Sequence, residues 1–319
     1  GGPAILDGKI AGVVMQGMQS ADNIGYMVPT PVIRHFLEDI EDGRYDGWPS
    51  IGVALQNMEN PDLKRSVKMP EGRTGVMIVG VVRGSAADGV LKPGDILLSI
   101  DGTNVADDGT VEFRPQERTS ISYVLQQHQL GETATIEFLR EGAVQEGELK
   151  LNRPMESDWL IPATQYDRLP TYYIYGGFVF CPLSVNLLQA WGPNWYNTAP
   201  NELTSRLSFN FLTDETNEIV LLLRVLPSDI NQGYHTTANW VIDRVNGKPI
   251  RDLKDLIRIV EQESEGPFVS FENRFGYRLI LDKKKAIETG PEILSTYRIP
   301  ADRSPDLKVE SATPAPTTD

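Results

Sequence analysis

The chain has few of the residues that most often carry covalent or catalytic chemistry. Its 319 residues include one cysteine, Cys181, and three histidines. A lone cysteine cannot form a disulfide within the chain, which suits a reducing compartment or a fold that needs no covalent cross-links. Cys181 ends the apolar run Phe178-Val179-Phe180. This position indicates a buried small hydrophobic side chain rather than a reactive thiol.

Long apolar runs and an excess of basic residues are also missing. No apolar stretch of the sequence approaches the about 20 residues that span a bilayer. The chain has 30 basic and 44 acidic side chains, which gives a net charge of −14, and it has no basic stripe. This charge balance argues against a surface that binds nucleic acid or anionic membranes.

Several signatures of enzyme sites are absent as well. The sequence has no Gly-x-Ser-x-Gly elbow, no glycine loop for phosphates or dinucleotides, and no paired metal-ligand spacing. We therefore expect neither a metal nor a cofactor. His35, His128 and His235 fall in different segments, so packed or solvated imidazoles are the simplest interpretation of all three.

Residues 1–40 form a short first segment. Apolar runs predict strands over Ile10–Gln16 and Ile24–Val28, and then a helix with Thr30 as its N-cap and Pro31 at its first position. Apolar residues recur along this helix at helical spacing and predict one apolar face. Two strands and one helix cannot bury a core alone, so we expect this segment to pack against chain that the sequence does not include.

Two larger units follow. After a polar linker, 41–49, residues 50–152 show alternating apolar strands, a helix predicted over 119–129 and a hairpin across Glu141-Gly142. After a second linker, 153–175, residues 176–300 repeat this order in weaker form. The run Lys283-Lys284-Lys285 indicates a solvated turn after the last strand, and residues 301–319 indicate a flexible tail.

Two motifs connect the chain to a known family. The run from Leu91 to Gly102, with Gly84-Ser85-Ala86-Ala87 before it, resembles the signature of a PDZ domain of the HtrA type. The opening Gly1-Gly2-Pro3-Ala4, followed by an apolar strand, is similar to the residues that follow the nucleophile in trypsin-like serine proteases.

The chain as a whole, from Gly1 to about Leu307, resembles the HtrA/Deg family of ATP-independent serine proteases with two PDZ domains. The later part of this resemblance is carried by 176–183, 231–234, 245–247 and 297–304. The resemblance implies a mainly β fold with helices (α+β), in which the C-terminal remnant of a trypsin-like β-barrel precedes two PDZ-like domains.

The resemblance also implies a divided protease site. The catalytic serine is expected immediately before Gly1, so the chain alone lacks the triad and should be inactive. The substrate cleft would include one strand that pairs with the substrate backbone, with the residues Val14, Met15 and Gln16. A second strand would form the back wall of the specificity pocket, with the residues Gly25, Tyr26 and Met27. The alternative is that Met15 and Met27 simply fill the core of the barrel.

The first PDZ-like unit carries the residues of a peptide clamp. A PDZ domain adds an extended peptide to a sheet edge and holds its carboxylate on backbone N–H groups. The predicted loop is Ser50-Ile51-Gly52-Val53, the predicted docking strand is Val53-Ala54-Leu55, and the predicted pocket wall is Ile121, Val124 and Leu125. The alternative is that the three wall residues belong to the ordinary core.

The second PDZ-like unit departs from the motif. Thr236-Thr237-Ala238-Asn239 stands where the first unit has Lys92-Pro93-Gly94-Asp95, and Trp191, Trp195 and Tyr196 cluster in an insert. We expect this unit to help assemble a homo-oligomer, or alternatively to cover its own core with these aromatics.

The family implies an endopeptidase of protein quality control that acts on unfolded or damaged proteins and on C-terminal peptides. Its setting would be a chloroplast, a mitochondrion, a nucleus or a bacterium. A non-catalytic PDZ scaffold or a pseudo-protease is the alternative.

Overall fold

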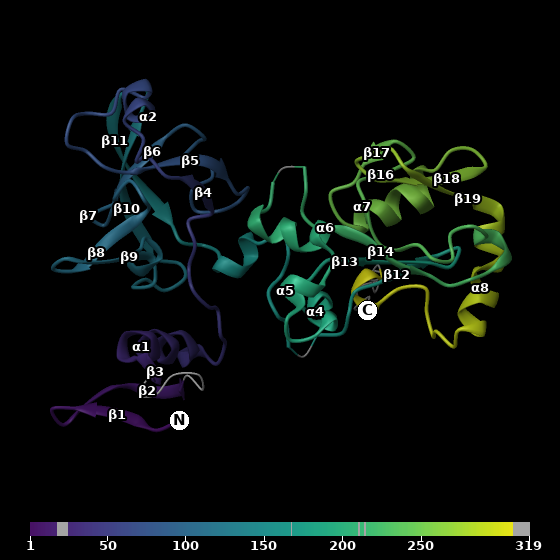
Figure 1. Cartoon of the computed structure of the whole chain (residues 1–319), viewed down its shortest axis with the longest axis horizontal. Coiled ribbons are helices and arrows are strands. Elements are labelled where there is room, and N and C mark those ends of the chain that lie inside the picture. Colours follow the sequence, from purple (N-terminus) through teal and green to yellow (C-terminus); the bar gives the residue numbers. More distant parts are fainter. Residues whose placement is uncertain (18–24, 167, 210, 214, 309–319) are drawn as a thin grey trace, which may run out of the picture. The chain divides into compact units, whose positions relative to one another are not determined.

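The computed structural model describes residues 1–17, 25–166, 168–209, 211–213 and 215–308. It divides into two compact units, Gly1–Asp158 and Trp159–Asp319, each built from antiparallel sheets and short helices (Figure 1). This architecture confirms the α+β class. None of the helices in these ranges is both long enough and apolar enough to cross a membrane.

The first segment is a small antiparallel sheet with one helix. The strands β1 (Pro3–Leu6), β2 (Lys9–Gly17) and β3 (Gly25–Pro29) lie in the order β1-β2-β3, and α1 (Thr30–Asp39) follows, with a short 3-10 turn, η1 (Ile40–Asp42), after it. The predicted helix is confirmed, but its predicted cap is wrong. Pro29 is the N-cap, no side chain caps the helix, and Pro31 lies in the first turn. Ile24, the first residue of the second predicted strand, lies outside the described residues.

This segment leaves its apolar side chains exposed. Leu6 is 67% exposed, and Leu37 on the predicted apolar face of α1 is 55% exposed. Among the described residues up to 40, His35 carries the one buried side chain other than glycine. The prediction that the segment buries no core of its own is therefore confirmed.

The stretch predicted as the first linker is held in place. The Asp39 carboxylate accepts hydrogen bonds from the N–H groups of Asp46 and Gly47. The His35 ring stacks on Trp48 with 3.8 Å between centroids and 13° between planes. The Trp48 carbonyl accepts the N–H of Met155. Residues 45–49 thus pack against their own unit instead of linking two free bodies.

The rest of the first unit is one sheet with short helices around it. Its main path runs β11-β10-β6-β5-β4, with β7 paired to β6 and a separate β8-β9 hairpin. The elements are β4 (Val53–Gln56), α2 (Pro61–Ser66), β5 (Val76–Val81), β6 (Ile96–Ile100), β7 (Thr103–Asn104), β8 (Thr110–Arg114), β9 (Glu117–Ser120), α3 (Ser122–Leu125), β10 (Thr133–Arg140) and β11 (Ala143–Lys150), followed by the turn η2 (Met155–Asp158).

The helix predicted over 119–129 is mostly wrong. Thr119 pairs with Val111 and Ser120 with Thr110 across the β8-β9 hairpin, so neither residue is helical. The helix α3 that follows spans four residues. The hairpin across Glu141-Gly142 is confirmed, and both residues have the positive φ, 53° and 83°, that such a tight turn requires.

The second unit contains two sheets, β12-β13-β14-β15 and β17-β16-β18-β19. Its strands are β12 (Tyr173–Tyr175), β13 (Phe178–Pro182), β14 (Val220–Val225), β15 (Ala238–Ile242), β16 (Arg244–Val245), β17 (Lys248–Pro249), β18 (Phe268–Glu272) and β19 (Arg278–Asp282). Its helices are α4 (Val185–Leu188), α5 (Trp195–Thr198), α6 (Asn201–Thr204), α7 (Leu253–Arg258) and α8 (Lys283–Thr296), with the short helical turns η3 (Gln189–Trp191), η4 (Ser205–Phe209), η5 (Asp229–Asn231), η6 (Ile259–Glu263) and η7 (Pro305–Leu307). The aromatic rings of Tyr173, Phe178, Phe180 and Phe271 meet at the centre of its main core.

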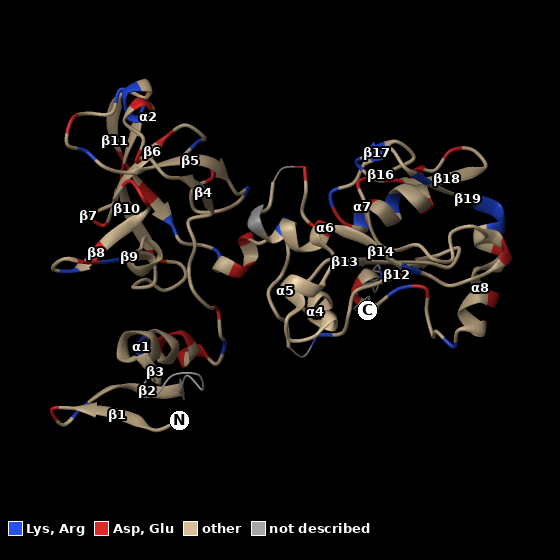
Figure 2. Cartoon of the chain, in the orientation of Figure 1, with Lys and Arg blue, Asp and Glu red and all other residues tan. Residues whose placement is uncertain are grey.

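Three predictions about this unit are wrong. The second linker, 153–175, includes strand β12 and the fully buried Ile161. The lysine run opens α8, where the Asp282 carboxylate caps the helix by accepting the Lys285 N–H at 2.9 Å (Figure 2). The start of the predicted tail is ordered, because Asp302 and Ser304 exchange backbone hydrogen bonds with β12 and the residue before it. The rest of that tail, 309–319, lies outside the described residues.

Candidate functional site

The loop before β4 takes a shape that only glycine accepts at its centre. Gly52 has φ +68°, and a Cβ atom there would lie 2.2 Å from the Cβ of Ser85. Its carbonyl accepts the N–H of Val82 at 2.8 Å. The sequence identified the correct glycine, but the structural cause is the packing of the loop against the Ser85 turn.

The loop is fixed on both sides by hydrogen bonds. The Gly52 N–H donates to the Ser50 hydroxyl at 2.9 Å. The Ile51 carbonyl accepts the N–H of Ala87, and the Ser50 N–H donates to the carbonyl of Arg153. The Ser50 hydroxyl therefore occupies a backbone donor that a bound anion would compete for.

The strand that follows the loop lies at a sheet edge. Strand β4 pairs with β5, matching Ala54 to Gly80, and on its other side it pairs with no strand of the described chain (Figure 1). The side chains of Val53 and Leu55 pack against the core of the unit. The free edge presents backbone groups that an added strand could pair with.

The three predicted wall residues are buried in that same core. Ile121, Val124 and Leu125 are 8%, 6% and 6% exposed, and they share one cluster with Ile51. The structure thus brings the loop, the strand and α3 together. It also supports the core interpretation of the three wall residues, since little of their surface faces solvent.

Two charged contacts near this site escaped sequence reasoning. Asp95, 1% exposed at the end of the Lys92-Pro93-Gly94 turn, receives two hydrogen bonds from Arg140 at 2.8 and 2.6 Å. Asp158, also 1% exposed, lies 3.7 Å from the Arg153 guanidinium. Burial raises the pKa of Asp158, and the nearby Ser50 hydroxyl and Arg153 oppose that rise only in part. Asp95 and Arg140 are 45 residues apart in sequence, so no local pattern connects them.

The residues expected in the substrate cleft lie on adjacent strands. Val14 on β2 pairs with Met27 on β3, and Gln16 pairs with Tyr26 next to Gly25. Met15 and Met27 are 60% and 49% exposed, so they do not fill a core among the described residues. The structure places these residues on adjacent strands, with the side chains of Val14, Met15, Tyr26 and Met27 exposed.

The second unit has a glycine loop at the corresponding place, but its edge is occupied. Gly176 and Gly177 have φ +55° and +84°, and a Cβ at Gly177 would lie 2.5 Å from the Asn231 amide nitrogen. Strand β12 turns at these glycines and pairs antiparallel with β13, opposite Phe178. The edge of β13 that corresponds to the free edge of β4 is therefore covered by the chain itself (Figure 1).

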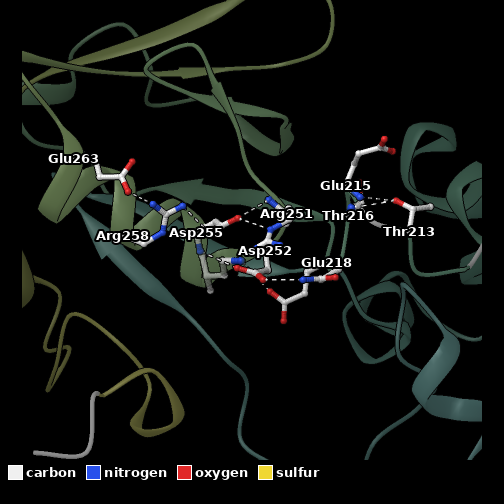
Figure 3. Close-up of polar contacts among 11 residues, drawn as sticks. Thr213, Glu215, Thr216, Glu218, Arg251, Asp252, Asp255, Arg258 and Glu263 are labelled. Atoms are coloured by element: carbon white, nitrogen blue, oxygen red, sulfur yellow. Dashed lines mark hydrogen bonds and ion pairs between the residues drawn. The ribbon is translucent and has the colours of Figure 1, made fainter. Parts of the chain in front are cut away.

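A ladder of ion pairs covers one side of α7 (Figure 3). Asp255 accepts hydrogen bonds from Arg251 at 3.1 Å and from Arg258 at 2.9 Å. Arg258 also pairs with Glu263, and Asp252 caps the helix at the Asp255 N–H. Asp255, Arg251, Arg258 and Glu263 pair with one another, and Asp252 is bonded to the helix N-terminus, so we interpret the ladder as support for the helix and not as a binding site.

The remaining candidate residues have structural roles. The Cys181 thiol is 8% exposed, and burial raises its pKa to about 12, as expected for a packed side chain. His128 bonds Asp101 at 2.8 Å and Glu132 at 2.9 Å. Trp191 and Trp195 pack against the core of their own unit, whereas Tyr196 is 57% exposed. The two tryptophans thus follow the alternative in which they cover their own core.

Both larger parts of the chain match known domain families. Residues 49–151 and residues 161–306 each match a PDZ domain family. The chain is 34% identical over 311 residues to the putative protease Do-like 3, mitochondrial, of Arabidopsis thaliana, covering 97% of this chain and 53% of that protein. It is 35% identical to the protease Do-like 2, chloroplastic, of the same plant, covering 96% of this chain and 50% of that protein.

The chain is also similar to more distant proteins. The chain is 23% identical to the serine protease DegP homolog of Plasmodium falciparum, covering 82% of this chain and 41% of that protein. Among solved structures, an HtrA-type protease AlgW with decapeptide is 25% identical with a TM-score of 0.33, covering 46% of this chain and 43% of that chain. The chain spans about half the length of the plant relatives it matches.

Proposed function

Since the chain belongs to the Deg/HtrA family of Do-like proteases and carries two PDZ domains, we propose that its first PDZ domain binds the free C-terminal ends of unfolded or damaged proteins. The bound peptide adds to β4 as a further strand, alongside Val53, Ala54 and Leu55. Its carboxylate lies at the Ser50-Ile51-Gly52 loop, where it displaces the Ser50 hydroxyl from the Gly52 N–H.

The observation that carries this proposal is the edge of β4, directly after a glycine loop, with which no strand of the described residues pairs. Ile121, Val124 and Leu125 are buried in the same core as Ile51 of the loop, so they help to fix the position of α3. An apolar last residue of the peptide suits this surrounding, because the core beneath the loop is aliphatic.

A peptide titration tests the proposal. A short peptide with an apolar last residue and a free carboxylate is compared with its C-terminally amidated twin by calorimetry. We expect the free carboxylate to improve the dissociation constant roughly tenfold, as charge-assisted hydrogen bonds to backbone N–H groups would give. Equal affinity of the two peptides would contradict carboxylate recognition at the loop.

For the whole protein, we propose an ATP-independent serine endopeptidase of protein quality control. Val14, Met15 and Gln16 would then border the substrate backbone, and Gly25, Tyr26 and Met27 the specificity pocket. Their position on paired, open strands supports this role.

A longer protein that carries this chain is assayed with casein, without ATP, in the presence and absence of a fluorophosphonate. Cleavage that the reagent stops is the expected result. A folded protein that binds peptide and leaves casein intact would instead indicate a scaffold or a pseudo-protease.

We further propose that the second PDZ domain contributes to a homo-oligomer and that the protein acts in an organelle. The occupied edge of β13 supports a role other than peptide capture for this domain. The mitochondrial and chloroplastic names of the plant relatives support the location. Light scattering over a range of concentrations tests the first point, and a monomer at every concentration would contradict it. Imaging of the fluorescently tagged longer protein tests the second.

A further inference from the structure

The segment that follows β11 is bonded to the start of the Ser50 loop. The Ser50 N–H donates to the Arg153 carbonyl at 3.1 Å, and the Met155 N–H donates to the Trp48 carbonyl at 2.8 Å. These two hydrogen bonds attach residues 153–158 to the chain that leads into the loop. A charge on this segment therefore acts at short range on the proposed site of the peptide carboxylate.

Asp158 ends this segment as a buried carboxylate. Its side chain is 2% exposed, and neither carboxylate oxygen has a hydrogen-bond partner of normal geometry within the described residues. The Ser50 hydroxyl is close enough to act on the pKa of Asp158 and to lower it, but burial raises that pKa by more. A buried carboxylate with so few partners is costly to keep ionised, so Asp158 takes up a proton more readily than an exposed aspartate.

Arg153 supplies a charge of opposite sign next to Asp158. Its Nε atom lies 3.7 Å from the Asp158 Oδ1 atom. Its Nη1 atom donates to the Arg83 carbonyl at 2.8 Å and would lie 3.6 Å from a Cβ atom built on Gly84. The guanidinium is thus held at the turn after β5, the same turn against which the loop packs. Because arginine keeps its charge, the pair is neutral while Asp158 is ionised and positive once Asp158 is protonated.

Other titratable side chains near this segment contact different groups: Glu156, Asp88 and His35. The Glu156 Oε2 atom would lie 3.6 Å from a Cβ atom built on Gly47. The Asp88 carboxylate accepts the Gly84 N–H at 2.7 Å, and the His35 ring stacks on Trp48. Within the described residues, the ion-pair partner of Asp158 is Arg153. The charge of this pair therefore depends on the proton of Asp158.

We propose that Asp158 is a specificity residue of the peptide site: the loop holds a C-terminal carboxylate best when Asp158 is protonated, and binding of that carboxylate drives proton uptake by Asp158. This inference rests on the proposed binding of C-terminal ends at the Ser50-Ile51-Gly52 loop. A carboxylate that replaces the Ser50 hydroxyl at the Gly52 N–H puts a negative charge where a neutral group stood beside Asp158. Two carboxylates at one site oppose each other's ionisation, whereas a protonated Asp158 leaves the Arg153 charge to attract the peptide.

Peptide affinity should consequently rise as the pH falls. The bound carboxylate raises the pKa of Asp158 further, so the complex holds more protons than the free protein over the range between the two pKa values. Lower pH then favours the complex by linkage. The peptide carboxylate itself stays ionised above its ordinary pKa of about 3.5. An amidated C-terminus carries no charge, so its affinity should not follow the proton of Asp158.

Calorimetry on the whole chain tests the inference with an N-acetylated peptide that has an apolar last residue and no titratable side chain. We expect the free-carboxylate peptide to bind at least roughly fivefold more tightly at about pH 5.5 than at about pH 7.5. The amidated twin should change less than roughly twofold over the same range. Titrations in two buffers of different ionisation enthalpy should show proton uptake with the free carboxylate and none with the amide.

Asp158→Asn separates this role from a structural one. The variant is neutral at every pH and keeps the shape of the side chain, so at about pH 7.5 it should bind the free-carboxylate peptide roughly fivefold more tightly than the parent chain. Its affinity should no longer depend on pH. Glu156→Gln is the matched control, because it removes an exposed carboxylate from the same turn and should keep the parent profile. Any contribution of His35 persists in both variants.

The outcomes distinguish this inference from the proposed function. Tighter binding of the free carboxylate than of the amide, with equal affinity at both pH values and no proton uptake, would overturn the role of Asp158 and leave carboxylate recognition intact. Equal affinity of the two peptides at both pH values would overturn both. A parent-like pH profile in folded Asp158→Asn would assign the proton to another group and also overturn the inference. Proton uptake by the parent chain decides the matter if Asp158→Asn fails to fold.

Discussion

The Cα of Gly52 lies so close to Ser85 that a Cβ atom on the glycine would come within 2.2 Å of the serine Cβ. This contact fixes the loop before β4 against the turn that follows β5. The contact with Ser85 thereby fixes the Gly52 N–H next to the start of β4, the strand at the edge of the sheet. The proposed peptide site depends on this contact, because a loop that moved away from Ser85 would separate the anion-binding groups from the docking strand.

Substitution of Gly52 by alanine tests that contact. We expect Gly52→Ala to lower the free energy of unfolding by roughly 2–4 kcal/mol, since both the clash and the positive φ oppose it. Gly102→Ala is the matched control: Gly102 has φ +72°, but a Cβ there meets nothing within 4 Å. The control should lose only about 1 kcal/mol, the usual cost of a left-handed alanine. Equal losses in urea denaturation would show that the Ser85 contact has no energetic weight.

The buried ion pair between Asp95 and Arg140 should stabilise the first PDZ domain. Arg140→Met removes the charge and leaves the Asp95 carboxylate, 1% exposed, without its partner. We expect a loss of about 3 kcal/mol in the free energy of unfolding. Arg65→Met is the control, because the Arg65–Asp62 pair has side chains that are 79% and 77% exposed. Exposed pairs contribute less than about 1 kcal/mol, so a similar loss in both variants would contradict the account.

His128 should make the stability of the same domain depend on pH. Burial acts to lower the pKa of His128, but its hydrogen bonds to Asp101 and Glu132 outweigh burial and raise it. A raised pKa means that the stabilising contribution is complete below the ordinary histidine pKa of about 6.5 and is lost as pH rises through the higher folded value.

We expect this contribution to reach roughly 1–2 kcal/mol, as for a hydrogen bond to a charged group. Urea denaturation between slightly acidic and alkaline pH measures it. In His128→Asn the decline over this window should become flatter. An unchanged pH profile in the variant would assign the dependence to other groups.

Arg303 should hold the segment that follows α8 against the rest of the second PDZ domain. Its guanidinium pairs with Glu261 at 2.5 Å and lies 5.1 Å from the ring centre of Tyr173. Arg303→Ala should lower the free energy of unfolding by about 1–3 kcal/mol. Lys308→Ala, at an exposed position nearby, should change it by less than about 0.5 kcal/mol. Matching thermal denaturation curves for Arg303→Ala and the parent chain would show that the Arg303 contacts do not stabilise the domain.

Local patterns were sufficient to predict most of the strands and tight turns. Runs of apolar residues placed β2 and β3, and Glu141-Gly142 marked the hairpin turn, because these signals depend on neighbours in sequence. Helix α8 was missed because Gly290 and Pro291 oppose helix formation locally. Its Asp282 cap and the packing of Ala286 and Ile293 into buried clusters provide stability that sequence propensity does not reveal.

In the candidate site, too, the sequence predicted the features that depend on local signals and missed those that depend on long-range contacts. The sequence identified Gly52 and the strand after it, since a glycine between apolar residues is a local signal. It could not show that Ser85 is the residue against which Gly52 packs, nor that Arg303 reaches Glu261, because both contacts join positions far apart in the chain. The helix predicted over 119–129 failed for a related reason, since the cross-strand partners of Thr119 and Ser120 override their local preference.

Hydrogen–deuterium exchange of residues 50–56, with and without a saturating peptide that has a free C-terminus, tests the central claim most directly. The account predicts slower exchange at the backbone amides of the loop and of β4, because the peptide would pair with the open edge and its carboxylate would bind the Gly52 N–H. Protection confined to other strands, with residues 50–56 unchanged while the peptide is bound, would contradict it.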